Sequence, residues 1–415
     1  MNLPSKLIPL LATIREAGGR AWLVGGSVRD HLLGLTPKDL DIEVHHLSAE
    51  ALEALLARQG RVNAVGRSFG VFKLRLGRDE LDIGLPQSGR ARTPQGEPIV
   101  VAGDPDMGIV EALRRRDLTI NAIAYDPLNG EYADPFDGRA DLKRQVLDAV
   151  DEQTFSEDPL RVLRVMQLAG RLGFTIAPRL ARLCQTLPIA ELPGERLLVE
   201  FEKLLLKSPL PSIGLRAARE ADIFPRLLPA LAEADGPALD SALDRAVAER
   251  RRQDPPLALM LAVLLHRCEP EGVVAILDRL KVFTLNRYPL RQRIVHATAQ
   301  WPSLTTPTSD RELCWMAESG ELALTARVAW AATGDELPRA LLLRAGALGI
   351  AHKPLPPLIR GRDLGEQGIP PGPWMGTLLR RVRTAQLDGT IQDKEDALAM
   401  SMRLWRDEDP RGGTG

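Results

Sequence analysis

Two carboxylates, Asp39 and Asp41, lie two positions apart in the alternating stretch Asp-Leu-Asp-Ile-Glu-Val. Residues i and i+2 of a β-strand point to one face, so both carboxylates project together while Leu40 and Ile42 face a core. Paired carboxylates suit Mg²⁺, which usually shares them with substrate phosphates. Such metals can activate an attacking hydroxyl group and neutralise a leaving pyrophosphate. Alone, the pattern is more often a solvated strand surface, so a second feature is needed.

That second feature is a phosphate-binding turn that precedes the acidic strand. Gly25, Gly26 and Ser27 follow the short apolar run 21–24 and open a predicted helix over 27–33. Free backbone N–H groups and the helix dipole at such a point bind phosphate. A Gly-Gly pair alone would be an ordinary tight turn, but here Arg29 also lies on the helix between the turn and the acidic strand.

Taken together, Gly-Gly-Ser-Val-Arg-Asp followed by Asp-Leu-Asp resembles the catalytic signature of the polymerase-β-like nucleotidyltransferases. The match is closest to the family of class II tRNA nucleotidyltransferases (CCA-adding enzymes) and bacterial poly(A) polymerases. Further motifs of this family follow in order, at Arg115 to Ala122, Asp134 to Gly138, Glu157 to Arg161, and Glu195-Arg196 with Glu200. The resemblance covers residues 20–206, about half of the chain.

The resemblance implies Mg²⁺-dependent transfer of a nucleotide to the 3′ hydroxyl of RNA. It makes Asp39 and Asp41 the metal ligands and catalytic carboxylates. Asp82, on the predicted strand 80–85, would be a third catalytic carboxylate near the primer hydroxyl, and the alternative is an ordinary strand-face Asp. The implied nucleotide-binding set comprises Gly25, Gly26, Ser27, Arg29, Arg115, Arg116, Asp117, Asn121, Asp158, Arg161 and Arg164.

Asp158 and Arg161 match the family's amino-acid template, which pairs with the base edge of incoming CTP or ATP. Their spacing of three predicts neighbours on one helix face. Asp offers only acceptors and Arg only donors, a combination that can satisfy cytosine or adenine but not uracil or guanine. The alternative is structural, because Asp-Pro is a favourable helix start and Arg161 could be a surface partner.

Family members differ in what they add. The segment 86–107, rich in Gly and Pro and without periodicity, is predicted to be a long functional loop. The resemblance implies a shortened loop at this place in enzymes that add only CC. The loop of this chain is full length, which argues against such an enzyme. CCA addition from CTP and ATP to tRNA is therefore favoured, and A-addition to tRNA ending in CC, a poly(A) polymerase and an inactive RNA-binding relative remain alternatives. A CCA-adding enzyme needs no obligatory protein partner.

The elements that must position these residues indicate an α+β fold. Alternating strands over 21–24, 40–44, 70–76 and 80–85 predict a small mixed sheet in the N-terminal part. From residue 155 onward, apolar spacings of three and four predict helices almost throughout. We expect a nucleotidyltransferase head over 1–145, a neck with the template over 146–210, a helical body over 211–350, and a helical tail over 351–415 with one long helix and a disordered end from Asp407.

The composition of the chain limits which partners and which kinds of site we expect. The formal net charge of the 415-residue chain is −1, so RNA binding must come from local clusters, and the tail offers Arg360, Arg362, Arg380 and Arg381. Three scattered cysteines fit a reducing cytoplasm, and no apolar run is long enough to cross a membrane. Only six histidines occur, so we expect no histidine-rich phosphohydrolase site; His266 is predicted to be an ordinary helix residue.

Overall fold

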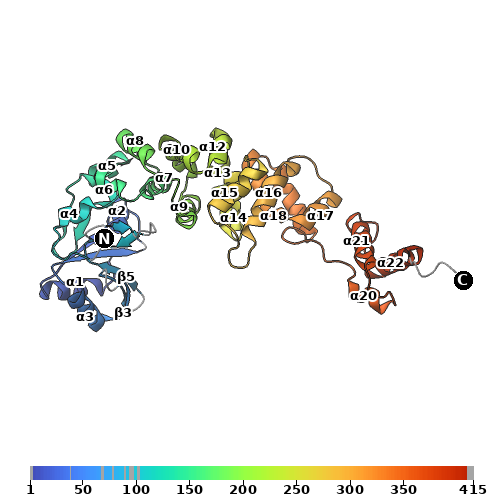
Figure 1. Ribbon diagram of the computed structural model, residues 1–415, viewed down its shortest axis with the longest axis horizontal. Coiled ribbons are helices and arrows are strands. Elements are labelled where there is room, and N and C mark those ends of the chain that lie inside the picture. The colour runs from blue at the N-terminus through green and yellow to red at the C-terminus, as the bar shows by residue number, and fades with distance from the viewer. Residues whose placement is uncertain are drawn as a thin grey trace. The chain divides into compact units, whose positions relative to one another are not determined.

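The computed structural model describes residues 3–37, 39–66, 70–76, 79–87, 90–92, 98–100 and 103–408. The chain forms two compact units, residues 1–227 and 228–415. The first unit contains a mixed sheet and helices, and the second is helical in its described part, as the predicted α+β fold requires (Figure 1). The finer division into head, neck, body and tail stays a prediction.

A seven-stranded sheet forms the centre of the first unit, in the order β3-β4-β5-β2-β1-β8-β9. Its strands are β1 (Arg20–Val24), β2 (Leu40–His45), β3 (Arg61–Gly66), β4 (Val71–Leu76), β5 (Asp79–Gly84), β8 (Ala124–Asp126) and β9 (Glu131–Ala133). The strands predicted at β1, β2, β4 and β5 are all present. β2 and β5 pair in parallel, and the other neighbours in this sheet are antiparallel.

Two amphipathic helices, α1 (Leu7–Glu16) and α3 (Ala49–Gln59), contact each other and strands of the sheet. α1 buries four apolar residues at helical spacing, Leu7, Leu10, Leu11 and Ile14. α3 begins at Ser48, whose hydroxyl accepts a hydrogen bond from the backbone N–H of Ala51.

The remaining helices of the first unit follow the sheet in sequence. α2 (Gly26–Leu32) connects β1 to β2, and the 3₁₀ helix η2 (Thr119–Asn121) precedes β8. A two-stranded parallel pair forms between β10 (Val146–Leu147) and β11 (Thr175–Ile176). The other helices are α4 (Ile109–Arg114), α5 (Gly138–Arg144), α6 (Glu152–Ser156), α7 (Arg161–Leu172), α8 (Pro178–Thr186), α9 (Gly194–Lys207), α10 (Pro211–Glu220) and α11 (Ile223–Leu227).

The segment 86–107 differs from the prediction of a loop without structure of its own. β6 (Arg90–Arg92) pairs antiparallel with β7 (Pro98–Val100), in the register Arg90↔Val100. The segments on either side of this hairpin also meet, at an isolated antiparallel bridge between Gln87 and Gly103. Residues 88–89, 93–97 and 101–102 lie outside the described residues. The sequence shows no apolar alternation here, so three-residue strands could not be recognised from periodicity.

In the second unit, α14 (Pro256–Leu265) is apolar on all sides and buries every residue from Leu257 to Leu265. It packs against α13 (Pro237–Glu249), α16 (Leu290–Gln300) and α18 (Leu322–Thr333), which explains why its sequence lacks a polar face. The other elements before residue 350 are α12 (Pro229–Ala234), η3 (Arg250–Arg252), α15 (Pro270–Arg279), η4 (Trp301–Thr305), α17 (Asp310–Ser319) and α19 (Leu337–Ala347).

The C-terminal segment contains three helices, α20 (Gly361–Glu366), α21 (Trp374–Leu387) and α22 (Lys394–Glu408), so the prediction of one long helix is wrong. Gly389, with a φ of +72°, lies in the turn that separates α21 from α22. The predicted disordered end begins inside α22, and residues 409–415 lie outside the described residues. A small core around Leu364, Leu378 and Val382 holds the three helices together.

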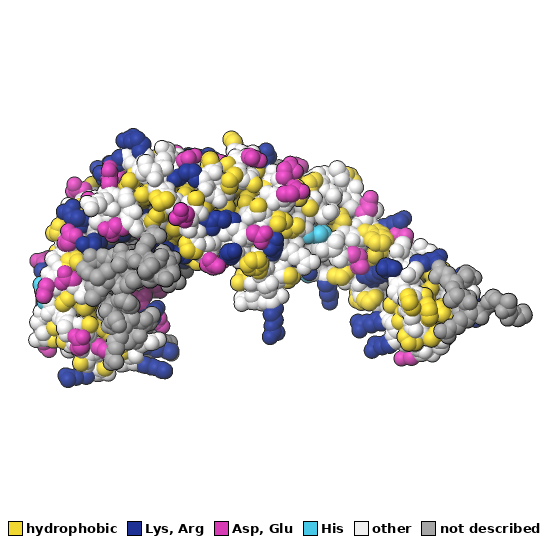
Figure 2. Space-filling model, viewed as in Figure 1, with side chains coloured by type: hydrophobic (Ala, Val, Ile, Leu, Met, Phe, Trp, Pro, Cys, Tyr) yellow, Lys and Arg dark blue, Asp and Glu magenta, His cyan; other side chains and the backbone are white. Residues whose placement is uncertain are grey.

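Lys and Arg side chains interleave with Asp and Glu on the face shown in Figure 2, in keeping with a net charge near zero. Across the described part of the chain, no helix combines the length and apolar character needed to span a membrane.

Candidate active site

The turn between β1 and α2 requires glycine for two separate reasons. Gly25 has a φ of +69°, a conformation that L side chains rarely adopt. A Cβ added at Gly26 would lie 3.2 Å from Nη2 of Arg29, whose side chain folds back over the turn. The Ser27 hydroxyl donates a hydrogen bond to the carbonyl of Val24 at 2.9 Å, so it stabilises the turn from within.

Asp41 and Asp82 are register partners on the parallel strands β2 and β5. Burial raises the pKa of Asp41 above its usual value; nearby Arg116 opposes this, and the carboxylates of Asp82 and Asp39 add to it. Asp39 is exposed and immediately precedes β2. Oδ1 of Asp82 lies 3.2 Å from Nζ of Lys73 on β4, a neighbour that the sequence analysis did not identify.

This donor set fits a divalent cation. The Asp82 carboxylate helps to raise the pKa of Asp41, and a cation bound between the two half-buried carboxylates would offset this repulsion. Within the described residues, no group of three or more His, Cys, Asp or Glu side chains is arranged to hold a metal ion by itself. A cation held by the neighbouring carboxylates Asp41 and Asp82 would therefore complete its coordination with water and nucleotide phosphates, as Mg²⁺ commonly does.

A cavity of about 320 Å³ brings the predicted residues together in the first unit. Its wall includes acidic and basic side chains from segments far apart in sequence, namely Asp41, Glu43, Asp82, Arg115, Arg116, Glu157 and Arg161. Three of the carboxylates come from β2 and β5, Arg115 and Arg116 follow α4, and Glu157 and Arg161 come from the segment that runs from the end of α6 to the start of α7. A cavity that pairs metal-binding carboxylates with several cations suits a nucleoside triphosphate with its metal.

Arg116 donates a hydrogen bond to Oε2 of Glu43 at 2.7 Å, and Arg115 lies 3.5 Å from Glu111. Glu43 was not among the predicted site residues. The signal that could have found it is its position two residues after Asp41, on the same face of β2.

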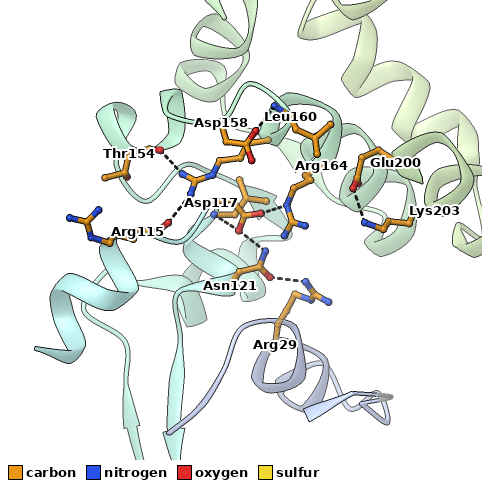
Figure 3. Close-up of polar contacts among 12 residues, drawn as sticks. Arg29, Arg115, Asp117, Asn121, Thr154, Asp158, Leu160, Arg164, Glu200 and Lys203 are labelled. Atoms are coloured by element: carbon orange, nitrogen blue, oxygen red, sulfur yellow. Dashed lines mark hydrogen bonds and ion pairs between the residues drawn. The ribbon is translucent and has the colours of Figure 1, made fainter. Parts of the chain in front are cut away.

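Several predicted nucleotide-binding residues form a buried network instead of lining the cavity (Figure 3). Asn121 accepts from Arg29 at 2.7 Å and donates to Asp117 at 2.9 Å. Arg164 donates to the other oxygen of Asp117 at 2.7 Å. Burial would raise the pKa of Asp117, but Arg164 and Asn121 hold it well below its usual range. The network therefore links α2, η2 and α7 to one another.

The template pair differs in detail from the prediction. α7 begins at Arg161, so Asp158 lies in the turn before the helix and not on a shared helix face. Both residues are buried, at 5% and 8% exposure, because that turn is covered by the neighbouring elements. Asp158 caps the turn by accepting from the N–H of Leu160, and it pairs with Arg196 on α9 at 3.5 Å.

Arg161 is held by two backbone carbonyl groups. Its Nη1 donates to the carbonyl of Thr154 at 2.5 Å, and its Nη2 donates to the carbonyl of Arg115 at 2.8 Å. Figure 3 shows Thr154 and Arg115 on either side of this contact. The base-reading arginine of the predicted template is thereby fixed to the segment that carries Arg115 and Arg116.

The four arginines predicted to bind RNA are all exposed: Arg360 immediately precedes α20, Arg362 lies on α20, and Arg380 and Arg381 lie on α21. Their role stays a prediction. His266 follows α14, and its Nδ1 lies 2.7 Å from the carbonyl of Val263, an arrangement that fits the predicted structural role.

The fold and the cavity define a nucleotidyltransferase with a polymerase-β-like head. Family models agree along the chain: the "Poly A polymerase head domain" matches residues 21–148, the "Probable RNA and SrmB-binding site of polymerase A" matches 173–235, and domain 2 of tRNA nucleotidyltransferases matches 263–401.

Among curated proteins, the CCA-adding enzyme of Pseudomonas putida is 35% identical over 63% of this chain and 68% of its own length. The CCA-adding enzyme of Streptococcus pneumoniae is 29% identical over 96% of both chains. The "Multifunctional CCA protein" of Methylococcus capsulatus is 39% identical, but the match spans about half of each chain, 51% of this one and 49% of the relative. The chain belongs to the family of tRNA nucleotidyltransferases that includes the CCA-adding enzymes.

Solved structures show the same fold. The Bacillus stearothermophilus CCA-adding enzyme in complex with CTP superimposes with a TM-score of 0.74 at 24% identity, over 99% of this chain and 100% of the other.

Proposed function

We propose that this protein adds C, C and A in order to the 3′ end of tRNA, using CTP and ATP and releasing pyrophosphate. The observation that carries the proposal is the cavity in which Asp41, Asp82, Arg115, Arg116 and Arg161 meet. The curated relatives named above as CCA-adding enzymes support the order of addition.

In the proposed mechanism, the acidic residues of the cavity bind the metal and the basic residues bind the phosphates. Asp39 and Asp41 would hold Mg²⁺, which would supply activation of the tRNA 3′ hydroxyl and charge neutralisation on the triphosphate. Asp82 lies nearest to the incoming hydroxyl, and Arg115 and Arg116 offset the charge that develops on the leaving pyrophosphate. Since phosphoryl transfer depends mainly on positioning and electrostatics, this division requires no covalent intermediate.

Base choice comes from Asp158 and Arg161. Their acceptor and donor groups complement the amino group and ring nitrogen that cytosine and adenine share in similar positions. Arg29, Asp117, Asn121 and Arg164 then act as a support, since they bond to one another and, unlike Arg161, do not line the cavity. The exposed arginines of α20 and α21 contact tRNA phosphates, and the reaction takes place in the cytoplasm.

The test is incorporation by purified protein with Mg²⁺ on three tRNA substrates, ending at the discriminator base, at C and at CC. Each substrate is offered single labelled nucleotides and then a mixture. Addition of C, C and A followed by a stop supports the proposal. Acceptance of A by the CC-ended tRNA alone would make the protein an A-adding enzyme. Continued A addition would indicate a poly(A) polymerase, and RNA binding without incorporation an inactive relative.

A further inference from the structure

Glu43 is a buried carboxylate in the wall of the cavity, and the mechanism above assigns it no task. It is 8% exposed and lies two residues after Asp41 on β2, hence on the same face of the strand. Its register partner on β5 is Gly84, which also lines the cavity. A buried carboxylate is costly unless it is paired, so its partners are informative.

Its principal partner is Arg116. Oε2 of Glu43 accepts from Nη2 of Arg116 at 2.7 Å, the geometry of a strong charge-assisted hydrogen bond. The Arg116 side chain is 30% exposed, so it can also reach a ligand.

The other end of the Arg116 guanidinium faces the catalytic turn. A Cβ placed on Gly25 would lie 3.7 Å from Nη1 of Arg116 and 3.6 Å from Oδ2 of Asp41. Arg116 therefore stands between two carboxylates, Glu43 and Asp41, which compete for the same cation. The structure pairs it with Glu43 and leaves Asp41 without a hydrogen bond from Arg116 among the described contacts.

A second side chain, His45, lies beside the Glu43 carboxylate. Its Oε1 lies 3.3 Å from Nε2 of His45, and Nδ1 of His45 lies 2.8 Å from the carbonyl of Met107. His45 is 2% exposed, and it lies on β2 two residues after Glu43. The Met107 carbonyl holds the His45 ring beside Glu43, and the hydrogen bond from Arg116 is the described contact that orients the carboxylate.

We propose that Glu43 is a positioning residue: it holds Arg116 away from Asp41 and presents the guanidinium to the phosphates of the bound nucleotide. Without the Glu43 charge, Arg116 turns to Asp41, occupies the carboxylate that the metal needs, and no longer faces the phosphates. This inference rests on the proposed function, because it assigns Arg116 to a nucleoside triphosphate.

The experiment is a double-mutant cycle on the full chain with Glu43→Gln, Arg116→Gln and the double variant. Calorimetry measures the Kd of CTP in Mg²⁺ without tRNA, so that no transfer occurs, and the same titration with pyrophosphate follows. We expect Glu43→Gln to raise both Kd values roughly tenfold, about 1.4 kcal/mol, and to raise the Mg²⁺ concentration needed for half-maximal CTP binding. In the Arg116→Gln background, Glu43→Gln should add nothing.

Two controls separate positioning from general damage. Glu131→Gln on β9 also removes a carboxylate from a Glu–Arg pair, with Arg20 at 3.0 Å, but it lies outside the cavity wall and should leave CTP binding unchanged. Glu43→Asp keeps the charge and should recover part of the affinity, which gives a second variant should Glu43→Gln fail to fold by circular dichroism.

Unchanged CTP affinity in folded Glu43→Gln would overturn the inference. So would a double variant in which Glu43→Gln raises the Kd of CTP as much as it does when Arg116 is present. Failure of the proposed function would look different. Wild-type protein would then add no C, C and A to tRNA, whatever the outcome of the CTP-binding cycle.

Discussion

Asp41 and Asp82 are direct register partners on the parallel strands β2 and β5, although 40 other residues separate them along the chain. Parallel pairing brings equivalent strand faces together, so the two carboxylates point into one cavity without any further adjustment of the backbone. The intervening α3, β3 and β4 make this pairing possible by returning the chain to the neighbouring position in the sheet. The site is thus a consequence of topology as much as of the acidic motif.

Removing one of these carboxylates should abolish turnover. We expect Asp82→Asn to lower the single-turnover rate of C addition roughly 10³-fold, about 4 kcal/mol of transition-state stabilisation, because it removes a charge beside the reacting groups. Rapid-quench assays with labelled CTP measure this rate. The matched control is Glu80→Gln on the same strand, an exposed residue whose carboxylate pairs with Lys73 at 3.1 Å. An Asp82→Asn rate within threefold of the control would show that Asp82 has no catalytic part.

The raised pKa of Asp41 predicts a pH-dependent gain in stability for Asp41→Asn. A carboxyl group whose folded-state pKa lies above its unfolded value of 3.8 destabilises the protein when ionised, that is, above the folded pKa. The destabilisation disappears as the pH falls below 3.8, where both states are protonated. In metal-free buffer, Asp41→Asn should therefore melt higher than wild type near pH 7, and the difference should shrink toward acid pH.

The measurement is the melting temperature across pH 4 to 8 with a chelator present, repeated with Mg²⁺. Added Mg²⁺ should stabilise only the wild type by binding the native state. A lower melting temperature for Asp41→Asn at neutral pH in metal-free buffer would contradict the burial argument.

Arg161→Ala should relax nucleotide choice. Loss of the guanidinium removes the donors of the predicted template, so we expect discrimination of CTP over UTP to fall by roughly 10- to 100-fold. Ratios of kcat/KM for CTP, ATP, UTP and GTP on matched tRNA substrates measure this selectivity. Arg182→Ala, an exposed arginine on α8, is the control that should leave the ratios unchanged. Should the Arg161 variant reject UTP and GTP as well as wild type does, base recognition lies elsewhere.

Gly25→Ala should weaken nucleotide binding as well as stability. A φ of +69° strains an alanine by about 1–2 kcal/mol, and the new Cβ would contact Asp41 and Arg116 at the catalytic turn. Gly34→Ala tests the strain alone, since Gly34 has a φ of +74° and a Cβ there would meet nothing within 4 Å. Both variants should melt lower than wild type, and only Gly25→Ala should raise the Kd of CTP. Equal CTP affinity in the two variants would refute a role for the turn.

Local pattern was enough to predict the centre of the sheet. β1, β2, β4 and β5 alternate or run apolar over five or six residues. The Gly-Gly turn could also be recognised, because its residues are consecutive in the sequence. β8 and β9 have three residues each, too short to show a period. α3 carried a usable signal that was missed: a Ser48 cap followed by Leu52 and Leu56 at helical spacing.

The limits of the sequence appear most clearly at contacts between distant segments. Glu43 and Arg116 are 73 positions apart, and no local period links them. The same holds for Asp158 and Arg196, which meet only because α9 packs against α7. Resemblance to a known family placed the motifs in order, but it could not show that Arg29, Asp117, Asn121 and Arg164 satisfy one another inside a buried network.

Arg161 donates to the carbonyl groups of Thr154 and Arg115, and this attachment bears on how the enzyme could change. A substitution that alters base choice also frees the end of α4, from which Arg115 and Arg116 project. In the proposed mechanism, base choice and contact with the phosphates would therefore depend on one shared structural support, and a change in the first would disturb the second. Laboratory evolution toward other nucleotides would have to recruit compensating substitutions in α4 or α6 before an altered preference could be combined with fast addition.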